Sequence, residues 1–333
     1  TVLFTEPAFT EIVIIIFLKL NNSVYKFCCI IIISATFLKK VRVALLMKKD
    51  LIDRIAVYLL KEGFTVKSLT GSCFDLLARK QENILIIKVL EDANSVSRQY
   101  VDEMDNVAAY LGATPLIIAE KAGNKLEDNV LYTRFGMYTL NFFTLANSIK
   151  SKFPFIKRTQ AGLTAYIDGN KLKKKREELG YSLNSLSKKI GVTKRMIIRY
   201  ENEDSEITIN RAMKIYNIFG GEVFNEIDIF SSSNMMESRD KSDFSKKYID
   251  LGFEARDTKK TPFDIIARKD NELILTEIGD KARPDFSSLS KILDADNLVI
   301  FKKKKPKYIP SMTKKEFLEF EKANQLIKFL KEF

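Results

Sequence analysis

The chain has 333 residues, enough for two or three domains, and a net charge of +12 from 55 Lys and Arg against 43 Asp and Glu. The absence of histidine from the sequence excludes Ser-His-Asp and Cys-His catalysis and every metal site that needs a histidine. The three cysteines cannot form a zinc ribbon or a disulfide framework, which favours a reducing, cytoplasmic setting.

The N-terminal segment 1–46 carries two apolar runs, at 12–18 and 27–38. Each run is shorter than the roughly 20 residues that a membrane helix needs, and the ordered charged, apolar and cleavage regions of a signal peptide are missing. Met47 then opens an amphipathic helix. We therefore interpret 1–46 as a non-native or disordered leader upstream of the true start, and expect no membrane association.

A repeat follows. The sequence Phe-Asp-Leu-Leu-Ala-Arg-Lys at 74–80 recurs as Phe-Asp-Ile-Ile-Ala-Arg-Lys at 263–269, and a Gly-Phe pair recurs at the same offset of 189. In each copy the pattern predicts a helix, two short strands, an apolar strand, a second helix and a further strand. The sequence therefore predicts two α/β domains of similar build on either side of a central segment.

The first copy resembles the restriction-endonuclease-like, PD-(D/E)xK, fold. In that family a strand Asp is followed by Glu-x-Lys on the next strand, where the acids hold Mg²⁺ and the lysine assists the attacking water. Asp75 and Lys88 match this pattern, but Ile86 stands at the position of the second acid. An apolar side chain cannot ligate magnesium.

The second copy departs further from the pattern. Asp264 matches the strand aspartate, but Leu275 and Glu277 stand at the positions of the acid and the lysine. We therefore expect nuclease-like scaffolds without nuclease chemistry, no bound metal and no cofactor; Asp75, Lys88 and Asp264 are vestigial metal-site candidates. An alternative is that the two aspartates only anchor a turn, or pair with Arg79 and Arg268.

The positive charge is concentrated in two places. Segment 170–202 holds ten basic and three acidic side chains, and segment 302–333 holds ten lysines and four glutamates. Clustered charge of this kind is typical of nucleic-acid binding. Solvated helix faces are the alternative explanation, and they account for 302–333 better than for 170–202.

The central segment carries a helix-turn-helix pattern. Ser182 can cap a helix with Leu186 and Ile190 turned inward, Gly191 ends it, and Thr193 caps the next helix. A turn of three or four residues with Gly between two short helices is the signature of a helix-turn-helix.

Three further helices complete this predicted unit. A helix before the pair places Leu172 and Leu179 on one apolar stripe. A fourth helix, 209–219, turns Tyr216 inward together with other apolar residues, and a short fifth helix is expected around 222–227.

The helix that begins at Lys194 separates its faces at 100° per residue. Met196, Ile197 and Tyr200 fall on the inner face, and the outer face is basic. Arg and Lys can reach guanine O6 and N7, and an isoleucine can contact a thymine methyl group. The predicted base-reading residues are Lys194, Arg195, Ile198 and Arg199. A merely solubilising basic face is the alternative.

These residues together resemble the Cro/cI (XRE) helix-turn-helix family over about 50 residues. The matching positions are Leu172, Arg176, Gly180-Tyr181-Ser182, Leu186, Ile190-Gly191-Val192-Thr193, Ile197 and Tyr200-Glu201-Asn202. The resemblance implies that Arg176 pairs with Glu201 and that this pair, like Gly191 and Thr193, has a structural role. It also implies that Asn202 contacts phosphate. Leu183 stands where the family often has Gln, which weakens the expected contact there.

From Met47 onward the chain resembles archaeal HTH-type transcriptional regulators with such a module between endonuclease-like segments. We expect a non-enzymatic, sequence-specific regulator of transcription that binds double-stranded DNA as a homodimer through its α/β domains, with an unknown effector. The further phosphate candidates are Lys171, Lys173, Lys174, Lys175, Lys188 and Lys189. The alternatives are a Mg²⁺-dependent nuclease guided by the helix-turn-helix and an antitoxin-like protein-interaction regulator.

The predicted fold class is α/β plus all-α, with two restriction-endonuclease-like α/β domains flanking a five-helix Cro/cI-type domain. The expected parts are the leader 1–46, an inactive nuclease-like domain 47–155, a linker strand 156–168, the DNA-binding domain 169–230, a linker 231–242, and a second nuclease-like domain 243–333 with a Lys-rich C-terminal helix.

Overall fold

The computed structural model describes residues 12–15, 30–33, 35–160, 162–231, 241–280 and 282–332. Strands β1 (Ile12–Ile15) and β2 (Ile30–Ile33) pair antiparallel, and helix α1 runs from Ala35 to Lys61. The helix predicted to start at Met47 thus extends upstream through 35–46, a segment interpreted from the sequence as part of a non-native or disordered leader. Of the rest of the predicted leader the structure describes only 12–15 and 30–33, and most of the linker 231–242 lies outside the described residues.

The first α/β unit is a mixed sheet covered by helices. Its strands are β3 (Thr65–Ser68), β4 (Leu76–Lys80), β5 (Asn83–Asp92), β6 (Thr114–Ala122), β7 (Asn124–Lys125), β8 (Val130–Arg134) and β9 (Met137–Leu140). Its helices besides α1 are η1 (Ala93–Ser95), α2 (Arg98–Leu111) and α3 (Phe142–Ile149). The α1 residues Leu51, Ile55 and Leu59 are spaced by one helical turn and are buried against one face of the sheet.

The second α/β unit repeats this order. It consists of α8 (Asp243–Asp250), β13 (Glu254–Asp257), β14 (Ile265–Lys269), β15 (Glu272–Ile278), α9 (Phe286–Leu293), β16 (Asp296–Phe301), β17 (Ser311–Thr313), α10 (Lys314–Glu319) and α11 (Ala323–Lys331). In both units the first three strands pair antiparallel and the third pairs parallel with the fourth. The strands β13, β14 and β15 begin 189 residues after β3, β4 and β5, which is the offset of the sequence repeat.

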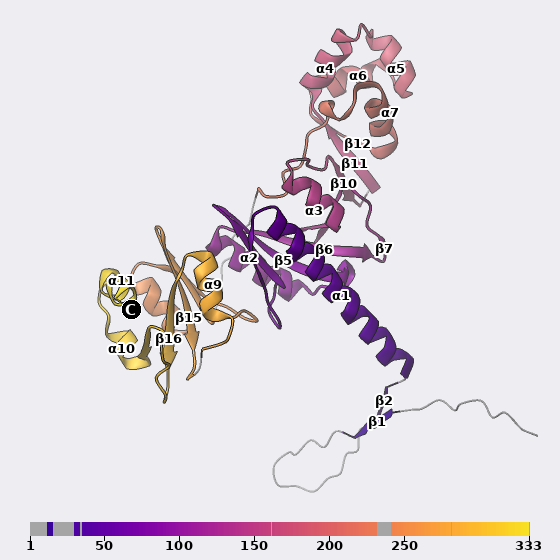
Figure 1. Ribbon diagram of the computed structural model, residues 1–333. Helices are drawn as coiled ribbons and strands as arrows, with labels where there is room; N and C mark the ends of the chain where they lie inside the picture. Colours follow the sequence, from indigo (N-terminus) through magenta and orange to yellow (C-terminus); the bar gives the residue numbers. More distant parts are fainter. Residues whose placement is uncertain are drawn as a thin grey trace, which may run out of the picture.

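The two units pack against each other within one chain, with α2 and α9 at the junction (Figure 1). Helix α2 contacts β14 of the second unit, and α9 contacts β3 and β4 of the first. Arg79 donates to the carbonyl of Ile292 at 3.0 Å, and Arg268, the same residue in the second copy, donates to the carbonyl of Tyr110 at 3.1 Å. Both carbonyls lie one residue before the end of their helix, so the contact is reciprocal across an approximate two-fold axis.

The helix-turn-helix unit stands at the far end of the first unit (Figure 1). Its elements are β10 (Ile156–Thr159), β11 (Gly162–Ile167), α4 (Gly169–Glu178), α5 (Leu183–Ile190), α6 (Lys194–Asn202), β12 (Ser205–Thr208), α7 (Ile209–Phe219) and η2 (Gly221–Val223). Strand β10 pairs with β8, so β10, β11 and β12 extend the sheet of the first unit.

Two expectations about this unit differ from the structure. The predicted fifth helix around 222–227 is only the one-turn 3₁₀ helix η2, so the unit has four α-helices. The segment 156–168, expected to be a single linker strand, contains two strands, β10 and β11, that form a hairpin. The short strand β12 was not predicted; it pairs with β11 and alternates buried and exposed residues from Ser205 to Thr208.

Candidate nucleic-acid interface

Local chemistry fixes the turn between α5 and α6. The Ser182 hydroxyl accepts a hydrogen bond from the amide of Ser185 at 3.0 Å and caps α5. Gly191 ends that helix with φ of 79°, a left-handed conformation that glycine adopts without strain. The Thr193 hydroxyl then accepts from the amide of Met196 at 3.2 Å and caps α6. The two helices are therefore joined by a turn of fixed geometry.

Helix α6 is held against α4 by a buried ion pair. The Arg176 guanidinium donates from Nε to Glu201 Oε1 at 2.5 Å and from Nη2 to Oε2 at 3.0 Å, which is the pair that the resemblance implied. The hydrogen bond to Glu201 raises the pKa of Arg176 above its ordinary value. Gly169 allows the close approach, because a Cβ atom there would lie 2.7 Å from the carbonyl oxygen of Tyr200.

The outer face of α6 is exposed and basic. Lys194, Arg195 and Arg199 are exposed, and Ile198 keeps 39% of its surface accessible, whereas Ile197 is fully buried. Arg199 Nε lies 3.5 Å from a carboxylate of Glu203, but both side chains are more than 60% exposed. Such a pair contributes little stability, so the guanidinium can exchange this partner for a DNA group at small cost.

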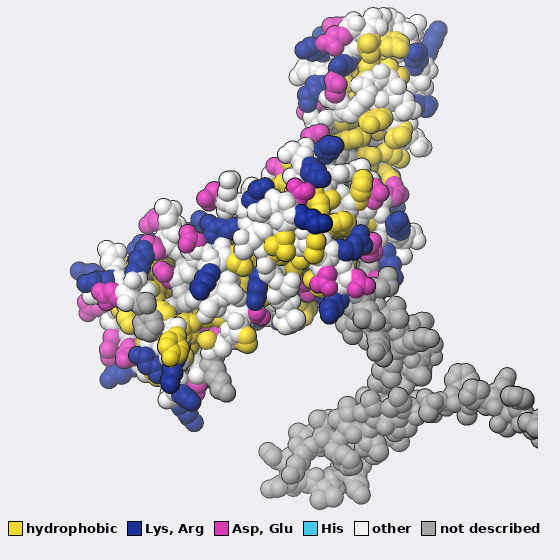
Figure 2. All heavy atoms as spheres, in the orientation of Figure 1, with side chains coloured by type: hydrophobic (Ala, Val, Ile, Leu, Met, Phe, Trp, Pro, Cys, Tyr) yellow, Lys and Arg dark blue, Asp and Glu magenta, His cyan; other side chains and the backbone are white. Residues whose placement is uncertain are grey.

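The predicted phosphate-contacting lysines fall into two groups. Lys173, Lys174 and Lys188 are exposed and have no ion pair within the described residues, and Asn202 is exposed as well. The others have partners: Lys171 with Asp168 (3.1 Å), Lys175 with Glu222 (2.9 Å), and Lys189 with the hydroxyl of Tyr181 (2.8 Å). Basic side chains lie on both flanks of this unit in Figure 2.

Two core predictions in this unit are wrong. Leu179, the C-cap residue of α4, is 55% exposed, whereas Leu172 of the same predicted stripe is fully buried. Tyr216 is 42% exposed and stacks on Phe155, with the ring centroids 5.9 Å apart, while its neighbour Ile215 is fully buried.

Asp75 is the aspartate of the first α/β unit that matches the nuclease pattern, and both of its carboxylate oxygens contact a cation or a backbone amide. Lys48 Nζ lies 2.9 Å from Oδ1 and Lys88 Nζ lies 3.4 Å from the carboxylate, and Val89 donates its amide to Oδ2 at 2.8 Å. Asp75 and Lys88 are both buried. The expected alternative partner, Arg79, instead contacts α9.

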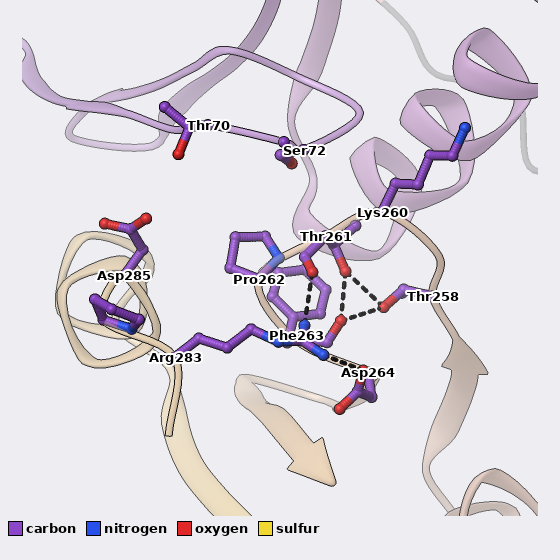
Figure 3. Close-up of a pocket in the computed structure, with 12 residues that line it drawn as sticks. Thr70, Ser72, Thr258, Lys260, Thr261, Pro262, Phe263, Asp264, Arg283 and Asp285 are labelled. Atoms are coloured by element: carbon purple, nitrogen blue, oxygen red, sulfur yellow. Dashed lines mark hydrogen bonds and ion pairs between the residues drawn. The ribbon is translucent and has the colours of Figure 1, made fainter. Parts of the chain in front are cut away.

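Asp264 is the counterpart of Asp75 in the second unit, and its carboxylate also contacts a cation and a backbone amide, but from different residues. Ile278 donates its amide to Oδ2 at 2.7 Å, as Val89 does in the first unit, and Arg283 donates to Oδ1 at 2.7 Å (Figure 3). Arg283 also lies 3.3 Å from Glu277, which replaces the lysine of the first copy and whose pKa burial raises. The cluster borders a cavity of about 510 Å³ between the two units.

The positions of the missing nuclease acids lie in the junction between the units. Ile86 and Leu275 are both fully buried, and both belong to the core cluster that joins the two units. Magnesium needs several oxygen ligands, whereas each aspartate here meets cations and a backbone amide. No group of three or more metal-ligating side chains occurs among the described residues. The residues present therefore do not fit a catalytic Mg²⁺ site.

Sequence reasoning missed Lys48 and Arg283, the cations that neutralise the two aspartates. Lys48 lies 27 residues before Asp75, and Arg283 lies 19 residues after Asp264. Neither spacing belongs to a helix or strand pattern, so only the tertiary fold reveals these partners.

Two protein families match separate parts of the chain. Residues 48–154 match a family described as a PD-(D/E)XK superfamily domain, and residues 172–223 match a helix-turn-helix family. Within the described residues, no helix has the length and apolar character needed to cross a membrane.

Curated relatives from archaea match most of the chain. A protein of Methanocaldococcus jannaschii is 29% identical over 86% of this chain and 98% of its own length. A protein of Thermococcus gammatolerans is 27% identical over 85% of this chain and 96% of its own length. A protein of Archaeoglobus fulgidus is 29% identical over 86% of this chain and 98% of its own length. Each is named "Putative HTH-type transcriptional regulatory protein". No solved structure matches the chain. The chain thus contains a helix-turn-helix domain and is similar, over most of its length, to archaeal proteins named as HTH-type transcriptional regulators.

Proposed function

We propose that the protein regulates transcription by binding double-stranded DNA in a sequence-specific manner, with a helix-turn-helix of the Cro/cI type. The observation that carries the proposal is the pair of faces on α6. The inner face is anchored by the buried pair of Arg176 and Glu201, and the outer face presents Lys194 and Arg195 without any ion pair within the described residues.

In this proposal α6 enters the major groove. Arg195 and Arg199 are placed to donate to guanine O6 and N7, and the Ile198 side chain to contact a thymine methyl group. Lys173, Lys174 and Lys188 contact phosphates and set the register of the protein on the duplex. Lys171, Lys175 and Lys189 first have to leave their present partners, so their contribution to affinity is smaller.

We also propose that the chain is not an enzyme. Support comes from Ile86 and Leu275, which occupy the acid positions of the nuclease pattern and are buried between the two units. The rival function is a Mg²⁺-dependent nuclease guided by the helix-turn-helix, favoured by the PD-(D/E)XK match. Cleavage of bound duplex in the presence of Mg²⁺, abolished by Asp75→Ala, would establish the rival.

Selection of bound sequences from a random duplex pool tests the proposal directly. We expect one preferred motif, and we expect Arg195→Ala to cost roughly 1–3 kcal/mol with relaxed preference at one base pair. Lys174→Ala, the matched control, should weaken binding to all sequences alike. A pool without enrichment, or two variants with the same uniform effect, would contradict sequence reading by α6.

We propose further that the protein binds DNA as a homodimer on half-sites about 34 Å apart, as helix-turn-helix proteins commonly do. The faces by which the two α/β units pack on each other are covered within one chain. In this proposal the α/β domains therefore form the dimer contact through other faces. Light scattering that finds only monomers, with and without operator DNA, would contradict the homodimer, and a stoichiometric copurifying protein would favour the antitoxin-like alternative.

A further inference from the structure

The basic C-terminal stretch contains two different kinds of lysine. Three lysines on α10 and α11 have acidic partners: Lys314 pairs with Asp243 at 2.9 Å, Lys328 with Glu332 at 3.7 Å and Lys331 with Glu272 at 2.5 Å. The loop that follows β16, residues 302–308 and here called the lysine loop, is different. Its five lysines are all exposed, and none of them has an ion pair within the described residues.

The backbone of the lysine loop is held in place by one carboxylate. Asp280 Oδ1 accepts from the amides of Lys302 and Lys303 at 2.8 Å each and from that of Lys304 at 3.4 Å. These hydrogen bonds lower the pKa of Asp280 below its ordinary value. The carboxylate thus fixes the backbone of the loop, and the lysine side chains are exposed.

Tyr308 closes the lysine loop in an unusual conformation. Its φ is 60°, a left-handed backbone that costs a non-glycine residue on the order of 1 kcal/mol. This cost is not offset by packing of the tyrosine ring, since the side chain is 96% exposed. The exposed tyrosine lies beside five lysines that have no ion pair within the described residues. Concentrated positive charge suits a phosphate backbone, and a tyrosine hydroxyl can donate to a phosphate oxygen.

We propose that the lysine loop is a second DNA-binding surface that contacts the duplex backbone without reading sequence. The inference rests on the proposed DNA-binding function and extends it to the second α/β unit. That unit lies at the opposite end of the molecule from the helix-turn-helix (Figure 1), and basic side chains gather at its outer end (Figure 2). The loop therefore contacts DNA outside the segment that α6 reads.

The test measures the affinity of the full chain for a random-sequence duplex of about 40 base pairs at salt concentrations from about 50 to 200 mM. The loop variant combines Lys302→Gln, Lys303→Gln and Lys304→Gln, which keeps the backbone amides that bind Asp280. The control variant combines three exposed lysines of the same unit that have no ion pair within the described residues: Lys246→Gln, Lys291→Gln and Lys315→Gln. Both variants lose the same net charge.

Each lysine that contacts a phosphate contributes about 0.9 to the slope of log K against log salt concentration. We expect the loop variant to lower that slope by about 2–3 and the control variant to leave it unchanged. Equal slopes for the two variants would overturn the proposal, as would a slope change seen on single-stranded RNA but not on the duplex. Tyr308→Ala should weaken binding severalfold, and an unchanged affinity would remove the tyrosine from the contact.

The outcome is separable from that of the proposed function. Discrimination between the selected operator and the random duplex depends on Arg195, whereas the slope on the random duplex depends on the lysine loop. Loss of one effect leaves the other measurable in the same titrations.

Discussion

The buried pair of Arg176 and Glu201 makes a quantitative prediction about the helix-turn-helix unit. Only 8% of the arginine and 7% of the glutamate are exposed, and two hydrogen bonds join them. Removing one member of such a pair strands a buried charge and typically costs 3–5 kcal/mol. In Glu201→Ala the guanidinium keeps the carbonyl of Tyr181 at 3.0 Å and the carboxylate of Glu177 at 3.1 Å. We therefore expect the lower end of that range, about 3 kcal/mol.

The assay is hydrogen exchange of α4, α5 and α6 in the full chain, because a chain of several units does not unfold in two states. A loss of about 3 kcal/mol accelerates exchange there roughly a hundredfold, while peptides of the second α/β unit stay unchanged. Glu203→Ala is the matched control. Glu203 is the C-cap residue of α6, and within the described residues its carboxylate pairs only with exposed Arg199, so its loss should cost less than about 0.5 kcal/mol.

A double variant tests the physical reason. Arg176→Met together with Glu201→Leu leaves no unpaired charge and should recover most of the stability that Glu201→Ala loses. The reasoning is refuted if Glu201→Ala exchanges no faster than Glu203→Ala, or if the double variant exchanges as fast as the single one.

Three more predictions follow from other contacts. Gly169→Ala should destabilise the same unit by about 1–3 kcal/mol, seen as faster exchange in α4, because its Cβ would meet the carbonyl oxygen of Tyr200 at 2.7 Å. Arg79→Met and Arg268→Met should each accelerate exchange in one helix of the junction, α9 and α2 respectively; uniform effects would contradict the reciprocal contact. Burial, and then Asp102, raise the pKa of Asp105 to about 6, so the folded state binds this proton more tightly than the unfolded chain and loses stability as pH rises from about 4 to 6. Asp105→Asn should therefore gain about 1–2 kcal/mol at pH 7 and nothing below about pH 4, seen as slower hydrogen exchange of α2 than in the parent chain at the same pH, and an equal gain at both pH values would contradict the assigned cause.

The parts of the fold that the sequence predicts well are local. The repeat predicts the strand order of both α/β units, because a strand, its turn and the next strand lie within about 20 residues of each other. On α6 the 100° spacing separates buried Ile197 and Tyr200 from exposed Ile198, since one helix carries the whole pattern.

The parts that escape prediction depend on partners distant in sequence. Helical spacing cannot choose between Ile215 and Tyr216, because the choice depends on β11 and Phe155, which pack against α7. The same holds for Lys48 at Asp75, and for the packing of α2 on β14, which belong to different α/β units.

The reciprocal junction also changes how the paired α/β units can diverge. In a dimer of identical chains each substitution appears twice, and association depends on protein concentration. Here the two halves share one chain, so their effective concentration is fixed and the pairing survives dilution. Each half can also change alone. Lys88 in one copy and Glu277 in the other occupy equivalent positions of the repeat, and a symmetric dimer of one gene product cannot contain such a difference.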